Sequence, residues 1–143
     1  MLFRSEAARL LGRPYSFASA VVQGKQLGRK LGFPTANQPL PQGRCMPPAA
    51  VYAAWIQTPD GLWRMGVCNI GAQPTVEGNT PLAETYILDY TGDLYGQVLR
   101  LAPWHKLRDI EKFESVEELR RTVLCNADQA RTILSGQKLP EIW

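Results

Sequence analysis

The chain has 143 residues, a length that fits one domain and allows a buried core without disulfide bonds. Hydrophobic residues make up 45% of it and charged residues 20%, and no apolar run approaches the ~20 residues of a membrane-spanning helix. The three cysteines stand far apart in the sequence, which disfavours a disulfide framework and a zinc site. Because the first residues also lack a secretory signal, we expect a soluble, cytoplasmic protein.

The net charge of +3 is distributed unevenly along the chain. Residues 1–44 hold seven basic residues and one acid, Glu6, whereas the remainder is acidic. Such an asymmetry occurs in nucleic-acid-binding proteins, but here the basic residues alternate with glycines in a loop without aromatic residues. This pattern favours a compact phosphate site, and a solvated charged face is the alternative.

The first third of the chain contains few regular patterns. Residues 6–11 have a short helical pattern that Gly12 and Pro14 end, and residues 17–23 have the apolar character of a short strand. A glycine-rich loop and a proline-rich stretch, residues 34–48, follow. Because proline fixes φ and cannot donate to a strand ladder, we expect this stretch to be extended and to wrap around the domain rather than fold.

The middle of the chain contains two pairs of predicted strands. Residues 51–56 and 62–70 flank Asp60-Gly61, two residues that tolerate the positive φ angles of a type I′ hairpin turn. Residues 82–88 and 97–101 are joined by a turn-rich segment, which predicts a second hairpin. With the first strand this gives five strands and no helix between them, a pattern typical of an antiparallel barrel or sandwich rather than a βαβ fold.

One amphipathic helix is predicted near the end of the chain. Ser115 and Glu118 have the spacing of a capping box, and Gly136 supplies a stop signal. Apolar residues recur between them every three or four positions, at Val116, Leu119, Val123, Ala127, Ala130 and Leu134. We expect this stripe to pack on the barrel, and a partner-binding helix is the alternative. We interpret the sequence as one domain, 1–143, with a linker-like lead-in at 1–13, a barrel at 14–113 and the helix at 115–135.

The segment after the first strand holds residues suited to phosphate and metal. The loop from Gly24 to Gly32 is not a Walker loop, but its glycines admit an anion close to the backbone; a flexible basic turn is the alternative. Thr35 and Asn37 stand two residues apart, so in an extended chain their oxygens point to the same side. Such neutral oxygens suit Mg²⁺ whose charge is met mainly by substrate phosphates, whereas a turn with local hydrogen bonds is the alternative.

Glu84 is the predicted general base. Strand alternation places it on one face with Leu82, Tyr86 and Leu88, and a carboxylate among apolar residues is costly unless it is used or paired. Desolvation at such a place raises a carboxyl pKa toward the range of a general base. A strand residue held in a salt bridge is the alternative interpretation.

Three other polar positions are candidates for ligand contacts. Asp89 and Asp93 lie in the turn-rich segment, where they are turn formers or contact a nucleotide. Arg108 precedes the last helix, and its planar cation can stack on a ligand or donate hydrogen bonds to it. An ion pair with Asp109 or Glu111 is the alternative for Arg108.

Four sequence blocks together resemble a known family. In chain order they are GRKLGFPTAN at 28–37, GVCNIGAQPT at 66–75, AETYILDYTGDLYG at 83–96 and LRDIEKFESVEEL at 107–119. Their order and spacing are similar to those of the riboflavin kinase family, including the kinase domain of bifunctional riboflavin kinase/FAD synthetase. The resemblance implies a mainly β fold, a six-stranded antiparallel Greek-key β-barrel with a C-terminal α-helix.

The resemblance also implies an activity, the ATP-dependent phosphorylation of riboflavin at its ribityl 5′-hydroxyl with Mg²⁺, which gives FMN and ADP. It assigns Glu84 as the catalytic base and places Thr35 and Asn37 at the metal and the nucleotide phosphates. Further nucleotide-binding positions are implied at Gly24, Arg29, Ile87, Asp89 and Tyr95. The flavin-binding positions implied are Arg108, Glu111 and Phe113.

The resemblance further bears on partners. Residues 5–15 are similar to the linker that joins an adenylyltransferase domain to the kinase in bifunctional enzymes, yet no nucleotidyltransferase motif occurs, so we expect a separate FMN adenylyltransferase partner. Small-molecule substrates are expected, with no nucleic acid and no membrane. The sequence departs from the family pattern at Ser19, Ala50, Gln73 and Tyr86. A non-catalytic flavin- or nucleotide-binding module, and a nucleic-acid-binding barrel, remain alternatives.

Overall fold

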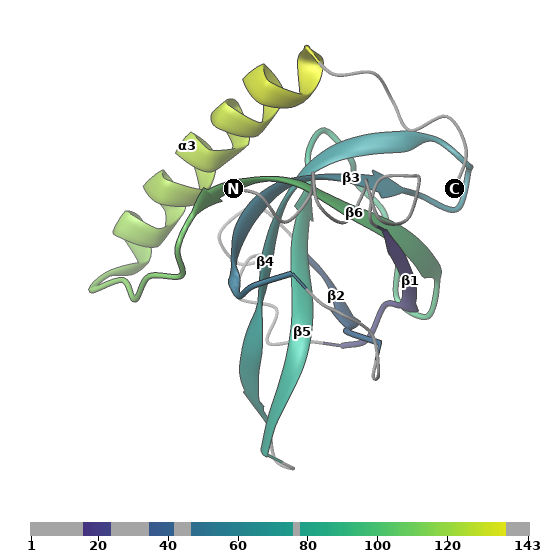
Figure 1. The fold of residues 1–143 in the computed structure, drawn as a ribbon, viewed down its shortest axis with the longest axis horizontal. Coiled ribbons are helices and arrows are strands. Elements are labelled where there is room, and N and C mark those ends of the chain that lie inside the picture. Colours follow the sequence, from purple (N-terminus) through teal and green to yellow (C-terminus); the bar gives the residue numbers. More distant parts are fainter. Residues whose placement is uncertain (1–15, 24–34, 42–46, 76–77, 137–143) are drawn as a thin grey trace.

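The computed structural model describes residues 16–23, 35–41, 47–75 and 78–136. The predicted helical pattern at 6–11 and the glycine-rich loop lie outside these residues, as does Cys45. The described chain forms six strands and one helix (Figure 1), which are β1 Phe17–Ala20, β2 Thr35–Pro39, β3 Ala50–Gln57, β4 Trp63–Thr75, β5 Gly78–Ile87, β6 Val98–Arg108 and α3 Val116–Ser135.

The six strands form one antiparallel sheet in the order β1-β6-β3-β4-β5-β2. The sheet curls until its two edge strands, β1 and β2, approach each other. Polar contacts join them, because Val22 N donates to Asn37 O at 2.7 Å and the buried Gln38 Nε2 donates to Ser19 O at 2.9 Å. The predicted six-stranded barrel with one C-terminal helix is therefore confirmed as a nearly closed barrel.

Alternating side chains give the barrel two apolar faces, as strand geometry requires. The inner face forms the core, whose large buried members are Phe17, Tyr52, Ile56, Ile70, Leu99 and Leu101. The outer face carries a second cluster against α3, which includes Val51, Trp55, Trp104, Ala127, Ala130 and Leu134. Fully burying one such large apolar side chain contributes roughly 1.5–3 kcal/mol. The helix is thus bound to the barrel by burial, which confirms the predicted packing of its stripe.

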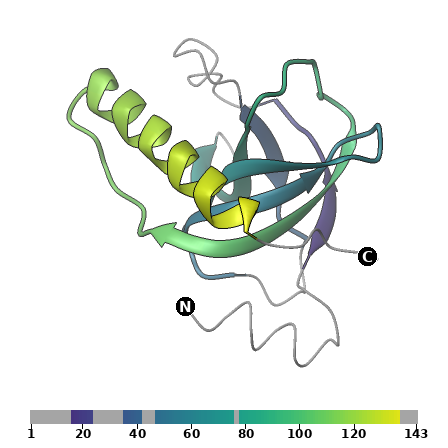
Figure 2. The ribbon, with the colours of Figure 1, turned by 90° about the horizontal axis from the view of Figure 1, so that it is seen from above.

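Helix α3 begins and ends as the sequence predicts, and Figure 2 shows it along one side of the barrel. Glu118 N donates to Ser115 Oγ at 3.1 Å, which is one half of a capping box. The Glu118 carboxylate instead accepts from Glu114 N at 3.3 Å, so the second half differs by one residue. Among the described residues, no helix has the length and apolar character needed to cross a membrane.

The turn between β3 and β4 differs from the prediction. Gly61 has φ +82°, but Asp60 is not among the residues with positive φ, so the type I′ turn is wrong. Gly61 N donates to Thr58 O at 2.8 Å and Thr58 N to Leu62 O at 3.0 Å, the pattern of a three-residue loop with Gly61 in the left-handed position. The Asp60 carboxylate explains why this loop forms instead of a type I′ turn, because it accepts hydrogen bonds from the Thr58 hydroxyl and Leu62 N.

Two further expectations were wrong. Strands β5 and β6 are not neighbours: β5 pairs with β4 and β2, and β6 pairs with β1 and β3, so residues 88–97 cross between strands instead of forming a hairpin. Residues 35–39 form strand β2 and do not merely wrap around the domain. Pro39 is tolerated there because it is the last residue of a strand at the end of the sheet order.

Candidate active site

Strands β2 and β5 bring the three residues of the predicted reaction centre together. Thr35 pairs with Tyr86 and Asn37 pairs with Glu84, and residues directly opposite each other share one face of a sheet. The Thr35 hydroxyl donates to Glu84 Oε1 at 3.2 Å. Thr35 and Asn37, being alternate residues of β2, lie on the same face, as the sequence predicts. This face is the outer surface of the barrel, since Ala36 between them lies in the inner core.

The surroundings of Glu84 are more polar than its own strand indicates. Its side chain is half-buried and lies between two asparagines in register with it, Asn37 on β2 and Asn69 on β4. In the described part of the chain, no cation forms an ion pair with Glu84, so the salt-bridge alternative has no support there. Cross-strand neighbours depend on register, and alternation within β5 gives no information about them.

The strand register continues this line of residues across the barrel. Asn69 pairs with Val51 on β3, and Val51 pairs with Arg108 on β6. One row on the outer face therefore contains Asn37, Glu84, Asn69, Val51 and Arg108. We call these five residues the site row. Neighbouring strands lie about 4.8 Å apart, so the three steps from Glu84 to Arg108 span roughly 14 Å along the sheet. The row gives the site an elongated shape.

The far end of the site row is a cluster around Arg108. Its Nε donates to Asn126 Oδ1 of α3 at 2.9 Å, and its guanidinium lies 5.5 Å from the centre of the Phe113 ring. Arg108 Nη1 lies 4.0 Å from Glu111 Oε1, a long ion pair, and it also donates a hydrogen bond to Asp109 O. Burial lowers the pKa of Arg108, and the charge of Glu111 opposes this. The structure thus assembles the three residues predicted to bind flavin.

An open hollow of about 310 Å³ lies along α3 next to this cluster. Its lining includes Asn126, the hydrogen-bond partner of Arg108, together with Glu118, Arg121, Thr122 and Cys125. Sequence patterns did not indicate these helix residues as ligand contacts, although Glu118 stood out as a capping residue. The available signal was the polar, non-core side of the helix pattern, which by itself does not distinguish a ligand surface from a solvated one.

Comparison with known proteins now identifies the family. A family model described as "Flavokinase: Riboflavin kinase" matches residues 11–134. The chain belongs to the riboflavin kinase family. The bifunctional riboflavin kinase/FMN adenylyltransferase of Pseudomonas fluorescens is 39% identical over 128 residues, which cover 89% of this chain and 40% of that protein. The chain therefore spans less than half the length of this curated relative.

Solved structures agree with the family assignment. Riboflavin kinase from Trypanosoma brucei superposes with a TM-score of 0.62 at 25% identity, covering 87% of this chain and 82% of that one. A structure titled as a macrolide-efflux protein from Streptococcus pneumoniae gives a TM-score of 0.77 at 27% identity, covering 94% of this chain and 43% of that one. The barrel with one helix is thus a riboflavin kinase-like fold.

The nucleotide-binding positions implied by the family fall in different environments. Ile87 faces the inner core, so only its backbone is available to a ligand. Asp89, at φ +55°, is exposed and pairs with Arg131 of α3 at 3.3 Å. Tyr95 is 62% exposed, and its N–H donates to Asp93 Oδ1, which confirms Asp93 as a turn former. Gly24 and Arg29 lie outside the described residues.

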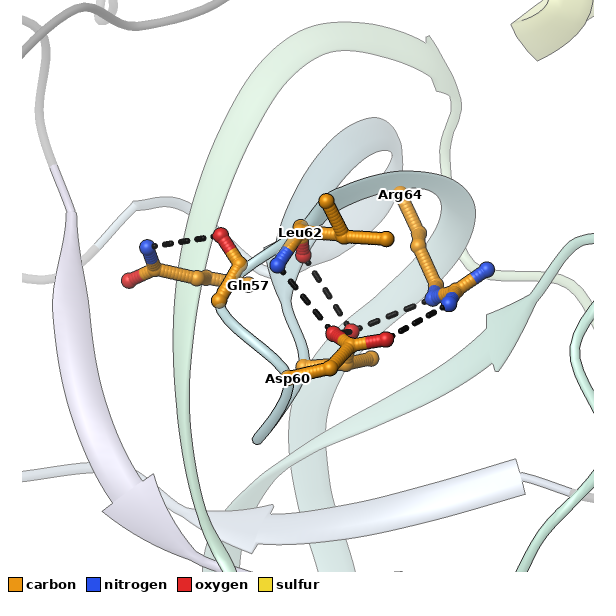
Figure 3. A network of polar contacts seen from close by, with 6 residues as sticks. Gln57, Asp60, Leu62 and Arg64 are labelled. Atoms are coloured by element: carbon orange, nitrogen blue, oxygen red, sulfur yellow. Dashed lines mark hydrogen bonds and ion pairs between the residues drawn. The ribbon is translucent and has the colours of Figure 1, made fainter.

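A polar network at the β3–β4 turn (Figure 3) also contacts the segment 88–97 through Arg64. Arg64 Nη2 lies 2.9 Å from Asp60 Oδ2, and the Arg64 guanidinium stands 4.6 Å from the centre of the Tyr90 ring. Hydrogen bonds from Thr58, Leu62 and Arg64 lower the pKa of Asp60 to about 2. The network links the turn to the segment that carries Asp89, a contact that sequence patterns did not indicate.

The departures from the family pattern leave Thr35, Asn37 and Glu84 intact. The Ser19 hydroxyl donates to Pro39 O at 2.7 Å and so helps to close the barrel. Ala50 is fully buried in the inner core. Tyr86 stands opposite Thr35, beside the reaction centre, and the side chain of Gln73 lies outside the described part. Two of the four departures therefore serve the barrel rather than the site.

The donor set of the site fits a magnesium ion that is held together with substrate phosphates. The described residues contain no group of three or more His, Cys, Asp or Glu side chains suited to a metal. Thr35 and Asn37 offer neutral oxygens instead, and the Thr35 oxygen keeps lone pairs while its proton bonds to Glu84. Mg²⁺ commonly takes few protein ligands and completes its shell with phosphate oxygens and water.

Proposed function

We propose that this chain transfers the γ-phosphoryl group of ATP to the ribityl 5′-hydroxyl of riboflavin, which yields FMN and ADP. The observation that carries the proposal is the hydrogen bond from Thr35 Oγ1 to Glu84 Oε1. It joins the motif residue expected at the nucleotide phosphates to the carboxylate expected at the acceptor hydroxyl. Membership of the riboflavin kinase family supports the same reaction.

Glu84 acts as the base. Its Oε1 accepts from Thr35, which leaves Oε2 to accept the proton of the 5′-hydroxyl. As the new oxygen–phosphorus bond forms, that proton passes to Glu84 and the bond between the γ-phosphorus and ADP breaks. Phosphoryl transfer has a loose transition state, so positioning and charge neutralisation supply most of the rate and one carboxylate suffices.

Thr35 and Asn37 are the residues that would hold Mg²⁺, through their neutral side-chain oxygens. Such an ion would supply positive charge against the charge that develops on the phosphates during transfer. The hydroxyl of Thr35 serves two neighbours, because it donates to Glu84 and offers its lone pairs to the ion. Thr35 is thereby the residue that ties the position of the base to the position of the phosphates.

The flavin ring lies at the other end of the site row, against Arg108 and Phe113. A planar guanidinium stacks on flat π-systems, and the Phe113 ring beside it supplies apolar surface. The hollow along α3 offers room next to this cluster. A substrate with its hydroxyl at Glu84 and its ring at Arg108 runs along the row.

The test is FMN formation from riboflavin, ATP and Mg²⁺ by purified protein, measured by chromatography with fluorescence detection. We expect turnover by the wild type and a loss of about 10²–10⁴-fold in Glu84→Gln, with riboflavin binding retained. Glu117→Gln, an exposed acid on the first turn of α3, is the matched control and should retain turnover. Absence of FMN with any nucleoside triphosphate would falsify the proposal, and flavin binding without turnover would favour the non-catalytic module.

A further inference from the structure

The side chain of Asn69 has a polar atom that the fold leaves unused. Its Oδ1 is buried, and none of the described residues donates a hydrogen bond to it. A buried acceptor without a partner costs about 1–3 kcal/mol. Native proteins rarely keep such an atom without a compensating role. The amide of Asn69 is therefore a candidate for a ligand contact.

The position of Asn69 on the site row indicates which ligand atom it meets. It stands directly opposite Glu84 on the neighbouring strand, and the next residue along the row toward Arg108 is the buried, apolar Val51. Asn69 is thus the polar side chain between the proposed base and the proposed ring contacts. A ribityl chain that joins these two ends passes over it.

A segment next to Asn69 is able to give way to a ligand. Gly71 has no side chain, and the space where its Cβ would stand is 2.9 Å from Ile110 Cδ1 and 3.8 Å from Asn69 Oδ1. Ile110 is 46% exposed and belongs to residues 109–114, which have no regular secondary structure. Moving this side chain breaks little core packing, so it is a movable cover beside the amide.

We propose that Asn69 accepts a hydrogen bond from a secondary hydroxyl of the ribityl chain and so selects polyol substrates beside Glu84. The inference rests on the proposed riboflavin kinase activity. Glu84 receives the proton of the reacting hydroxyl, and Asn69 fixes a neighbouring hydroxyl that does not react. Sites built to bind a substrate hydroxyl reject analogues that lack it, because the buried polar group is then left unpaired.

The test is binding of riboflavin and of analogues that each lack one ribityl secondary hydroxyl, followed by flavin fluorescence with Mg²⁺ and ADP present. We expect Asn69→Leu to weaken riboflavin binding about tenfold. For one deoxy analogue, wild type and Asn69→Leu should bind within about twofold of each other, because the contact is already absent. Gln57→Leu, which alters an exposed amide near the β3–β4 turn, should bind like the wild type.

The outcomes separate this inference from the proposed function. Equal riboflavin affinity in wild type and Asn69→Leu, or an equal loss for every analogue, overturns the role of Asn69 even when the wild type makes FMN. A wild type that binds riboflavin but makes no FMN overturns the kinase proposal. The role of Asn69 is then still decided by comparing riboflavin binding in the wild type and in Asn69→Leu. Asn69→Ser, which keeps an acceptor oxygen, should recover part of the affinity, and its thermal midpoint reports folding.

Discussion

The two ends of the candidate site are held in place by different means. At the reacting end, Thr35 and Glu84 belong to paired strands, so the backbone ladder sets their relative position. At the ring end, Arg108 also stands on a paired strand, as the last residue of β6, but Phe113 lies in the irregular segment 109–114, and side-chain contacts of Arg108 with Asn126 and Phe113 hold this end together. Groups on paired strands are positioned more accurately than groups on irregular segments.

This difference predicts different kinetic effects at the two ends. A change at the strand-held end disturbs interactions made in the transition state and lowers kcat. A change at the ring end disturbs interactions that the bound substrate already makes, so it raises KM with little effect on kcat. The following substitutions test this division.

The largest effect after loss of Glu84 itself is expected for Thr35→Val, which keeps the shape of the side chain and removes its hydroxyl. Hydrogen bonds to charged groups are worth about 1.5–3 kcal/mol, so kcat should fall about tenfold to a hundredfold. The KM for riboflavin should change less than threefold. Thr132→Val, on the exposed side of α3, is the control, and an unchanged kcat in Thr35→Val would contradict the role of the hydroxyl.

At the ring end we expect Arg108→Lys to raise the KM for riboflavin about tenfold while kcat stays within about threefold. Lysine keeps the charge but loses the planar group that bonds Asn126 and faces Phe113. Steady-state kinetics at saturating ATP measure both constants. Arg120→Lys, an exposed change on α3, is the control. An equal loss in kcat would show that Arg108 acts in the transition state. It would contradict the expectation that changes at the ring end affect KM and changes at the reacting end affect kcat.

The barrel interior beneath the site should lose stability at alkaline pH. Burial raises the pKa of Tyr52 from 10.0 to about 12, and the charge of Cys68 raises it further. Burial likewise raises the pKa of Cys68 from 9.0 to about 12, and the charge of Glu84 also acts to raise it. The unfolded chain then releases protons that the native state retains, so stability is full below pH 9 and falls between pH 9 and 12.

Urea midpoints measured from pH 8 to 11 check this expectation. The variants Tyr52→Phe and Cys68→Ala should each be less stable at pH 8 through lost contacts, yet show a shallower decline above pH 9. Curves that run parallel to the wild type would contradict the assigned burial effects. The reacting end should share the decline, because Glu84 lies on the strand next to Cys68.

The smallest effect is expected for Arg64→Met, which removes the guanidinium from the network at the β3–β4 turn (Figure 3) and with it the contact with Tyr90. Exposed cation–π contacts are worth about 0.5–1 kcal/mol, so amide exchange in residues 88–97 should accelerate about two- to fivefold. The KM for ATP should rise by a similar factor and the KM for riboflavin should not change. Lys112→Met is an exposed control, and unchanged exchange would show that the network does not hold the segment.

Features that depend on local sequence were predicted well. The capping residue Ser115 and the apolar stripe ending at Leu134 defined α3, because both signals lie within the helix itself. The alternation of Thr35 and Asn37 likewise placed them on one face, which the structure confirms. Glu84 was identified because a carboxylate in a strand is unusual, and the family resemblance then supplied its proposed role.

Features that depend on contacts between distant residues were not predictable in this way. The pairing of β6 with β1 and β3 is non-local, so adjacent strands in the sequence gave the wrong hairpin. Asn69 went unnoticed because its importance follows from its register with Glu84 and not from its own neighbours. The Asp60 turn was missed because side-chain hydrogen bonds, rather than the residue pair alone, decided its conformation.

A crystal structure with riboflavin, ADP and Mg²⁺ tests most directly whether the site row binds the substrate. We expect the ribityl 5′-hydroxyl at hydrogen-bond distance, about 2.6–3.2 Å, from Glu84, with the flavin ring against Arg108 and the chain between them over Asn69. Riboflavin bound elsewhere on the barrel, or with its 5′-hydroxyl far from Glu84, would contradict the arrangement proposed for this riboflavin kinase family member.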